Sequence, residues 1–204
     1  LREELHHLLA AGVCVVQLDE PVLTEVVHGT VGEGGRTFMC GALGDRGTAE
    51  EELTFARDLL QELLNGVSPH RTALHVCRGN WTPDDTVAMR GGYAPLIDML
   101  SSIPVGAYLL EGCTPRAGDV DVLRALPDDR RIGVGVIDQK HPDHHDRAAL
   151  AARMRAATNQ FGRERVLFHP DCGFATFADN PIIDAATSEA VLTALVEVRD
   201  ELDG

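Results

Sequence analysis

The sequence predicts an α/β fold in which parallel strands alternate with helices. Three observations favour this class: short apolar runs recur along the chain, helical apolar patterns follow several of them, and polar residues stand where the runs end. Such runs are typical of strands that are buried on both faces of a parallel sheet. The alternation predicts either a doubly wound sheet or part of a (β/α)8 barrel, and periodicity alone does not choose between them.

The first predicted elements are a helix and a strand. Residues 1–11 carry leucines on one stripe and end before Gly12, which is typical of an amphipathic helix and its stop signal. The apolar run at residues 13–18 predicts the first strand. The polar residues 19–21 then lie at the carboxyl tip of that strand.

The rest of the chain repeats this pattern. Thr48 and Glu51 have the spacing of a capping box, which predicts the start of a helix that Asn65 and Gly66 close. The remaining predicted strands are residues 72–76, 106–110, 132–137 and 166–168. The remaining predicted helices are residues 120–125, 147–157 and 188–202. If the fold is a barrel, the five strands are three short of the eight that a complete barrel requires.

Composition restricts the class of partner. The 204 residues include 32 Asp and Glu against 18 Lys and Arg, which gives a formal net charge of −14. This excess of negative charge argues against binding to nucleic acid or to an anionic membrane surface. No apolar run approaches the roughly 20 residues that span a bilayer, and the first residues do not resemble a signal peptide. We therefore expect a cytoplasmic protein with a single domain over residues 1–204.

The cysteines indicate reduced thiols. They are Cys14, Cys40, Cys77, Cys113 and Cys172. An odd number of cysteines spread over a long chain does not fit a small disulfide framework. We expect these thiols to be buried or bound to metal.

Candidate metal ligands gather at the expected carboxyl edge of the sheet, where parallel α/β folds keep their sites. His75 and Cys77 are two residues apart, so a strand places both on one face. Glu111 ends the next predicted strand, and Cys172 follows the last one. Two thiolates, an imidazole and a carboxylate are ligands that Zn²⁺ accepts tetrahedrally, whereas Mg²⁺ and Ca²⁺ favour oxygen.

Spacing alone leaves a simpler interpretation open. A lone His-x-Cys on a strand is more often a buried cysteine beside a hydrogen-bonded histidine. A structural zinc knuckle is disfavoured, because such sites use closely spaced cysteine pairs and the sequence has none. Ligands that come from three separate strand ends favour a reactive centre, because the sites of such folds are assembled from several loops.

Several motifs resemble the zinc site of the cobalamin-independent methionine synthase family. The order His-x-Cys, Glu, Cys is accompanied by QLDEP at residues 17–21, GVGVID at 133–138 and PDCG at 170–173. HVCRGN at residues 75–80 and RAGD at 116–119 look closer to the short single-barrel homologues than to the long two-barrel enzymes. The resemblance runs from about Val13 to Pro181. It implies that the chain is the C-terminal portion of a (β/α)8 TIM-type catalytic barrel, with about five parallel βα units.

The resemblance implies a zinc-dependent methyltransferase. Zinc would be held by four ligands: His75, Cys77, Glu111 and Cys172. The metal would bind the thiol of homocysteine and lower its pKa, and a 5-methyltetrahydrofolate would donate the methyl group to give methionine. Glu111 is the ligand that an arriving sulfur displaces most easily, and Cys113, on the same strand face, could substitute for it.

The resemblance also implies residues for substrate binding and proton transfer. Asp19, with Glu20 close by, would hold the substrate ammonium group, although an acidic pair at a strand end could equally form a helix cap and turn. The folate nitrogen leaves poorly unless it is protonated, so a general acid is needed. In the long enzymes a histidine stands two residues after the GVGVID aspartate, and here that position is Lys140, with His141 next to it. Either Lys140 or His141 delivers the proton, or the donor needs no acid, or neither residue has a role.

Two other functions remain open. One is a related thiol alkyltransferase that keeps the zinc thiolate and changes the electrophile, for example to an epoxide. The other is a catalytically incompetent partial barrel that acts as a subunit. Because a five-strand portion would expose two long parallel edges, we expect a missing N-terminal segment or a second chain to complete the barrel.

Overall fold

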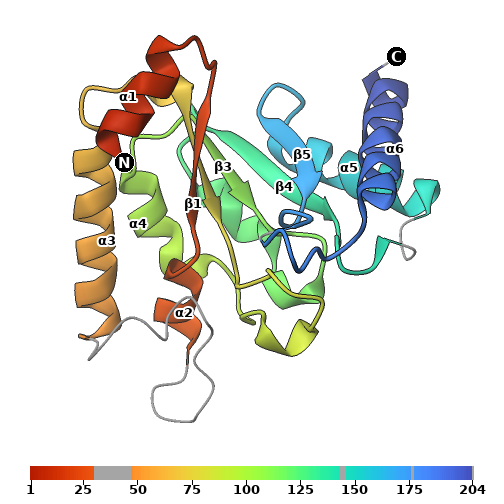
Figure 1. The fold of residues 1–204 in the computed structure, drawn as a ribbon, viewed down its shortest axis with the longest axis horizontal. Helices are drawn as coiled ribbons and strands as arrows, with labels where there is room; N and C mark the ends of the chain where they lie inside the picture. Colours follow the sequence, from red (N-terminus) through yellow and green to blue (C-terminus); the bar gives the residue numbers. More distant parts are fainter. Residues whose placement is uncertain (30–46, 143–145, 176, 204) are drawn as a thin grey trace.

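The sheet of the computed structural model has five parallel strands in the order β1-β2-β3-β4-β5, and the structure describes residues 1–29, 47–142, 146–175 and 177–203. The strands are β1 (Val16–Glu20), β2 (Thr72–Val76), β3 (Ala107–Leu110), β4 (Arg131–Ile137) and β5 (Val166–Pro170). The α-helices are α1 (Arg2–Ala10), α2 (Leu23–His28), α3 (Ala49–Leu64), α4 (Ile97–Ser102), α5 (Arg147–Phe161) and α6 (Ala185–Asp203). In Figure 1, α1, α3 and α4 lie on the β1 side of the sheet and α5 and α6 on the β5 side. This architecture confirms the predicted α/β class.

Alternate residues of each strand point to opposite faces of the sheet. One face carries large apolar side chains that are almost fully buried: Leu74, Val76, Tyr108, Leu110, Ile132 and Val134. The other face, called the inner face below, carries mostly small or polar residues and one leucine: Ala73, His75, Ala107, Leu109, Gly133, Gly135 and His169. The polar chemistry predicted for the carboxyl edge therefore lies on the inner face.

Local signals in the sequence account for the longer helices. Thr48 Oγ1 accepts a hydrogen bond from Glu51 N, and the Glu51 carboxylate accepts one from Thr48 N at 2.7 Å, which completes the predicted capping box of α3. Asp146 caps α5 by accepting a bond from Ala149 N at 2.6 Å. These interactions satisfy backbone N–H groups that would otherwise lack partners at a helix start.

The structure differs from the predicted elements in several bounds, in one type and in two additional helices. The helix expected over residues 120–125 is a 3₁₀ helix (Val120–Ala125), which Asp119 caps. The first strand begins at Val16 and continues through Glu20, because every residue of 16–20 pairs with β2. Helices α2 and α4 were not predicted. Each has six residues, too few for a helical apolar period to stand out from the sequence.

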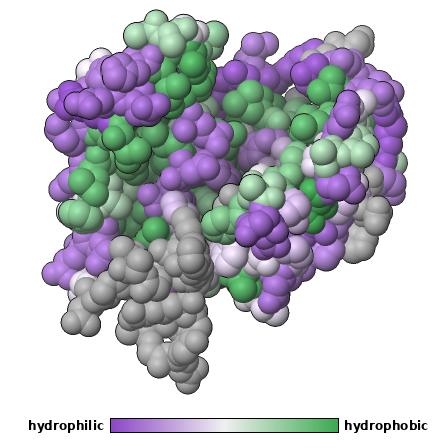
Figure 2. All heavy atoms as spheres, in the orientation of Figure 1, coloured by the Kyte–Doolittle hydropathy of each residue, from purple (hydrophilic) through white to green (hydrophobic). Residues whose placement is uncertain are grey.

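Both edge strands keep one unpaired side within the described residues, β1 at one end of the sheet and β5 at the other. Two exposed apolar side chains, Val13 and Val15, lie just before β1. Figure 2 shows apolar surface over this part of the molecule. Among the described helices, none has both the length and the apolar character that a membrane crossing requires.

Candidate functional site

Strand β2 brings two of the predicted ligands to the inner face. His75 lies between Asp19 of β1 and Leu109 of β3 in the sheet register. Cys77 follows the strand directly, and its backbone N donates to Glu20 O at 3.1 Å, which extends the pairing with β1. Both side chains are buried. A fully buried strand therefore fixes the His-x-Cys pair at the carboxyl edge.

Cys172 meets this pair from the other end of the sheet. The ligand atoms of His75, Cys77 and Cys172 all lie within 4.8 Å of one another, and we call these three residues the thiolate cluster. The two sulfurs are 3.7 Å apart and are not joined in a disulfide. Cys113 and the exposed Cys14 are also free thiols. The fifth cysteine, Cys40, lies outside the described residues.

Hydrogen bonding fixes which ring nitrogen of His75 faces the cluster. Because the Leu109 carbonyl can only accept, His75 Nδ1 is the donor in their 3.0 Å hydrogen bond. His75 Nε2 is buried and makes no hydrogen bond within the described part of the chain. An imidazole whose Nδ1–H is held by a backbone carbonyl is the usual arrangement of a metal-bound histidine.

The two sulfurs lie within hydrogen-bond distance, and this contact moves their pKa values in opposite directions. The hydrogen bond from Cys172 lowers the pKa of Cys77 to about 4, although burial opposes this shift. The Cys77 thiolate in turn raises the pKa of Cys172, and burial adds to this rise. Burial lowers the pKa of His75, but Cys77, the Leu109 carbonyl and the charge of Asp19 together raise it, and the net shift is upward. The cluster is therefore an electron-rich centre that a cation would stabilise.

The donor set fits zinc. Two thiolates bound tetrahedrally to one Zn²⁺ at 2.3 Å are about 3.8 Å apart, close to the 3.7 Å between Cys77 Sγ and Cys172 Sγ. The buried His75 Nε2, which has no hydrogen bond within the described residues, would supply the third ligand atom. Hard cations such as Mg²⁺ would require oxygen ligands in place of the two sulfurs.

Glu111 lies beside the thiolate cluster but is not one of its three members. Its carboxylate is fully buried and accepts hydrogen bonds from Arg78 N at 3.1 Å and from Asn80 Nδ2 at 3.3 Å. Burial, with the charges of Asp171 and Cys77, raises the pKa of Glu111 to about 8. Cys113, its alternative, is also outside the three, and burial raises its pKa to about 12.

The two acidic residues of β1 have different surroundings. Asp19 is exposed on the inner face, beside His75 in the sheet register, and accepts a hydrogen bond from Gln17 at 2.8 Å. Glu20 is half-buried and accepts a bond from Val22 N at 2.9 Å, just before α2. Burial raises the pKa of Glu20. Asp19 is therefore open to a ligand at this edge, whereas Glu20 is engaged at the turn into α2.

The side chains of Arg116, Lys140 and His141 converge on the carboxylate of Asp85. We call these four residues the Asp85 cluster. Arg116 Nη1 lies 2.9 Å and Lys140 Nζ 3.4 Å from Asp85 Oδ1. His141 Nε2 lies 3.0 Å from Asp85 Oδ2. The hydrogen bond with His141, followed by the bond and charge of Arg116, lowers the pKa of Asp85 to about 2 despite some burial.

The two candidate acids in the Asp85 cluster differ in access. The Lys140 side chain is fully buried and also donates to the Asp84 carbonyl at 3.0 Å, and burial lowers its pKa. The His141 side chain is 40% exposed. Only His141 can therefore reach a molecule in solvent without rearrangement.

Comparison with known proteins identifies the family. Residues 73–195, more than half of the chain, match the family described as "Cobalamin-independent synthase, Catalytic domain". The chain belongs to this family. It is 26% identical over 200 residues to the 5-methyltetrahydropteroyltriglutamate–homocysteine methyltransferase of Mycolicibacterium paratuberculosis, covering 98% of this chain and 23% of that protein. It is 22% identical to a methionine synthase of Saccharolobus islandicus, covering 99% of this chain and 49% of the relative.

Solved structures of the synthase family share the fold. The structure of a B12-independent methionine synthase from Shewanella sp. W3-18-1 in complex with selenomethionine matches with a TM-score of 0.71 at 20% identity, covering 98% of this chain and 53% of that one. This likeness confirms that the five βα units are a portion of the barrel type found in these synthases. The chain spans about half, or less, of the length of the relatives described here.

Sequence reasoning left three buried polar residues around this synthase-family site without a settled role. Arg78 donates to the carbonyls of Gly91 at 2.6 Å and Ala117 at 3.3 Å, and its guanidinium lies 4.3 Å from the Tyr93 ring centroid. Asn80 holds the Glu111 carboxylate. Both therefore hold the loops around Glu111 in place. Asp171, within PDCG, was not singled out, although its position next to Cys172 was a signal.

Proposed function

We propose that this chain carries the zinc centre of a methyltransferase that moves a methyl group from a 5-methyltetrahydrofolate to the thiol of homocysteine, giving methionine. The observation that carries this proposal is the convergence of a His75 ring nitrogen with the sulfurs of Cys77 and Cys172. The names of the relatives support the same reaction. Zinc bound here would hold a substrate thiol as a nucleophilic thiolate at neutral pH.

The residues around the cluster divide the remaining tasks. His75, Cys77 and Cys172 would hold the metal, and Glu111 is the proposed fourth ligand, released when a substrate sulfur arrives. When the Glu111 carboxylate is not bound to metal, Arg78 and Asn80 supply its hydrogen-bond donors. A ligand with two alternative sets of partners is suited to exchange.

Asp19 is the proposed site for the ammonium group of the amino-acid substrate. It is exposed on the inner face beside His75, and its carboxylate is accessible to a cation at this edge. Glu20 is a weaker candidate, because its carboxylate is engaged with Val22 N. A carboxylate here would also select thiols that carry a positive charge.

His141 is the proposed proton donor to the leaving folate nitrogen. Asp85 orients its ring at 3.0 Å, in the way that a carboxylate commonly orients a catalytic histidine. Lys140 is buried and bonded on two sides, so its proposed part is limited to supporting Asp85. The same burial of Lys140 supports a second candidate function, an alkyl transfer whose donor needs no acid at that position.

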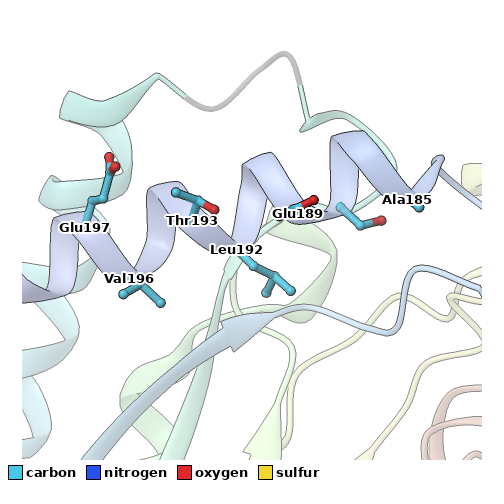
Figure 3. A pocket seen from close by; sticks show the side chains of 7 residues that line it. Ala185, Glu189, Leu192, Thr193, Val196 and Glu197 are labelled. Carbon is cyan, nitrogen blue, oxygen red and sulfur yellow. The ribbon is translucent and has the colours of Figure 1, made fainter.

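A polypeptide segment outside these 204 residues is proposed to complete the domain, as an N-terminal part of the same protein or as a second chain. Apolar pairs are exposed on helices at both ends of the sheet, Phe55 and Leu59 on α3 and Leu192 and Val196 on α6. Figure 3 shows Leu192 and Val196 on the same side of α6. Helices of the missing βα units would cover these pairs, and the missing strands would pair with β1 and β5.

The completed barrel can be tested at Leu192. In the complete protein, Leu192→Asp should lower the melting temperature by several degrees, because it places a charge in a covered apolar contact. In the isolated 204-residue chain the same change should have little effect, because Leu192 is exposed there. Equal effects in both proteins would contradict the proposed covering of α6.

The zinc centre can be tested by metal analysis. We expect about one zinc per chain, and we expect Cys172→Ser to remove it. Cys113→Ser is the matched control, since Cys113 is a half-buried free thiol outside the three-residue group. Zinc retained by Cys172→Ser would contradict the site.

The reaction can be tested with the complete protein. Homocysteine and methyl-folate should turn over to methionine, and other alkyl donors should not. Turnover of an epoxide or another donor in place of methyl-folate would favour the second candidate function.

We propose that the reaction takes place in the cytoplasm, where thiolate ligands stay reduced.

A further inference from the structure

Asp171 links the loops that carry Cys172 and Glu111. It follows β5 directly, and its backbone N donates to Ile137 O at 2.8 Å at the end of β4. Its side-chain Oδ1 accepts two hydrogen bonds, from Gly112 N and from Cys113 N, each at 2.9 Å. These two N–H groups follow Glu111 immediately. One carboxylate therefore ties the end of β3 to the residue that precedes Cys172.

The space for this carboxylate is provided by Gly135 of β4. A Cβ atom at position 135 would overlap Asp171 Oδ1. Gly112 also lies close to β4, where a Cβ would be 3.0 Å from a Val134 methyl group and 3.2 Å from Gly135 O. The chain therefore packs closely around the link between Asp171 and the β3 loop.

A carboxylate in this place is costly by itself. Asp171 is fully buried, and burial raises its pKa to about 6 even though the bonds from Cys113 and Gly112 act in the opposite direction. Oδ2 is buried and has no hydrogen-bond partner within the described residues. A buried, incompletely paired carboxylate lowers stability, and such groups are retained most often where a site needs them.

Other contacts hold Glu111 but do not reach Cys172. Its side chain is bonded to Arg78 and Asn80, and its carbonyl accepts from Tyr93 at 3.2 Å. These partners belong to the connection after β2. Asp171 is the contact that places the backbone after Glu111 relative to the β5 end, where the Cys172 sulfur joins the cluster.

We propose that Asp171 is a positioning residue of the zinc centre, whose bonds to Gly112 N and Cys113 N keep Glu111 and Cys172 directed at the same cation. This inference rests on the zinc site proposed above. Asp171 touches no substrate in this role. It acts through the two ligands, as partners of metal ligands do in other metal sites.

Two substitutions at position 171 separate the hydrogen bonds from the charge. Asp171→Asn keeps an oxygen that can accept both N–H groups, so zinc affinity should stay within about 3-fold of the wild type. Asp171→Ala removes the acceptor and should weaken zinc binding by roughly 10- to 100-fold. Zinc affinity is measured by competition with a chelator. The cobalt-substituted protein should show a changed thiolate-to-metal absorption band in Asp171→Ala and an unchanged one in Asp171→Asn.

Two further variants test whether the loss of zinc affinity in Asp171→Ala comes from the position of its carboxylate. Asp119→Ala is the matched control, because Asp119 also accepts a backbone bond after β3, from Asp121 N at 2.8 Å, but on the exposed surface. It should leave zinc affinity and the cobalt spectrum unchanged. Gly135→Ala displaces the Asp171 carboxylate without removing it, so it should reproduce the zinc and cobalt effects of Asp171→Ala.

The outcomes distinguish this inference from the proposed function. If the wild type binds zinc and Asp171→Ala binds it equally well with an unchanged cobalt spectrum, the positioning role is refuted and the zinc site stands. If Asp171→Ala and Asp171→Asn lose zinc equally, the hydrogen bonds are not the cause and the role is also refuted. If the wild type binds no zinc, both proposals fall.

Discussion

The thiolate cluster and the Asp85 cluster both lie at the carboxyl ends of the strands, but they gather groups of different charge. In the first, His75 Nε2 is buried and has no hydrogen bond within the described residues, and two sulfurs face each other at 3.7 Å. In the second, one carboxylate meets Arg116, Lys140 and His141. The first arrangement gathers electron-pair donors, and the second surrounds one carboxylate with cationic side chains. This difference separates a metal site from a group that orders loops and orients a histidine.

The largest expected effect tests the metal-site half of this contrast. His75→Ala should weaken zinc binding by roughly 1,000-fold or more, because one of the protein ligands of the metal is lost. His169→Ala is the control, since the two rings lie 6.4 Å apart on the inner face and His169 is outside the cluster. Chelator competition measures both variants. If both lose zinc equally, the assignment of His75 is wrong.

The next effect tests whether the Asp85 cluster takes part in chemistry. His141→Ala in the complete protein should reduce methyl transfer by about 100-fold, because a positioned general acid is lost. Zinc content should not change. Methionine formation and metal analysis on the same sample measure the two quantities. Normal turnover in this variant would remove His141 from the mechanism.

A smaller effect concerns stability. Asp85→Ala leaves the buried Lys140 and Arg116 without their carboxylate, and the free energy of unfolding should fall by roughly 1 to 3 kcal/mol, less than for a fully buried pair because Asp85 is partly exposed. Asp58→Ala removes the exposed partner of Arg57 and should cost less than about 0.5 kcal/mol. Denaturant unfolding measures both. Equal costs would mean that the Asp85 cluster is no more than a surface ion pair.

The smallest effect is a pH dependence. The pKa of Asp85 falls from 3.8 to about 2 on folding, so its contribution to stability is complete above about pH 4 and is lost as the pH falls towards 2. Asp85→Asn should lack this part of the acid dependence. The difference in unfolding free energy between wild type and variant, measured from pH 5 to pH 2, should therefore shrink as the pH falls. A constant difference would contradict the lowered pKa.

Strand positions and the three cluster residues could be predicted from sequence because their signals are local. Strand β2 has the predicted bounds, and the two-residue spacing of His75 and Cys77 places both on one face whatever the rest of the chain does. The order of the strands then brings Cys172 to the same edge. Short helices such as α4 carry too few residues to show a period.

The surroundings of the site could not be predicted, because they depend on contacts between loops far apart in sequence. The Glu111 carboxylate accepts from residues 31 and 33 positions away, and Asp171 accepts from N–H groups 58 and 59 positions away. Nothing in a strand pattern encodes those partners. Lys140 shows the same limit, since sequence left it as a candidate acid and only its burial separates it from His141.

The buried Arg78 has a consequence for protein engineering. Its backbone N binds Glu111, while its guanidinium fastens the loops at Gly91 and Ala117 and stacks on Tyr93. Transplanting only the ligand side chains into a foreign barrel would leave the grafted carboxylate without this support. A successful graft would need to include Arg78, Tyr93 and the loops that contain Gly91 and Ala117 together with the ligands.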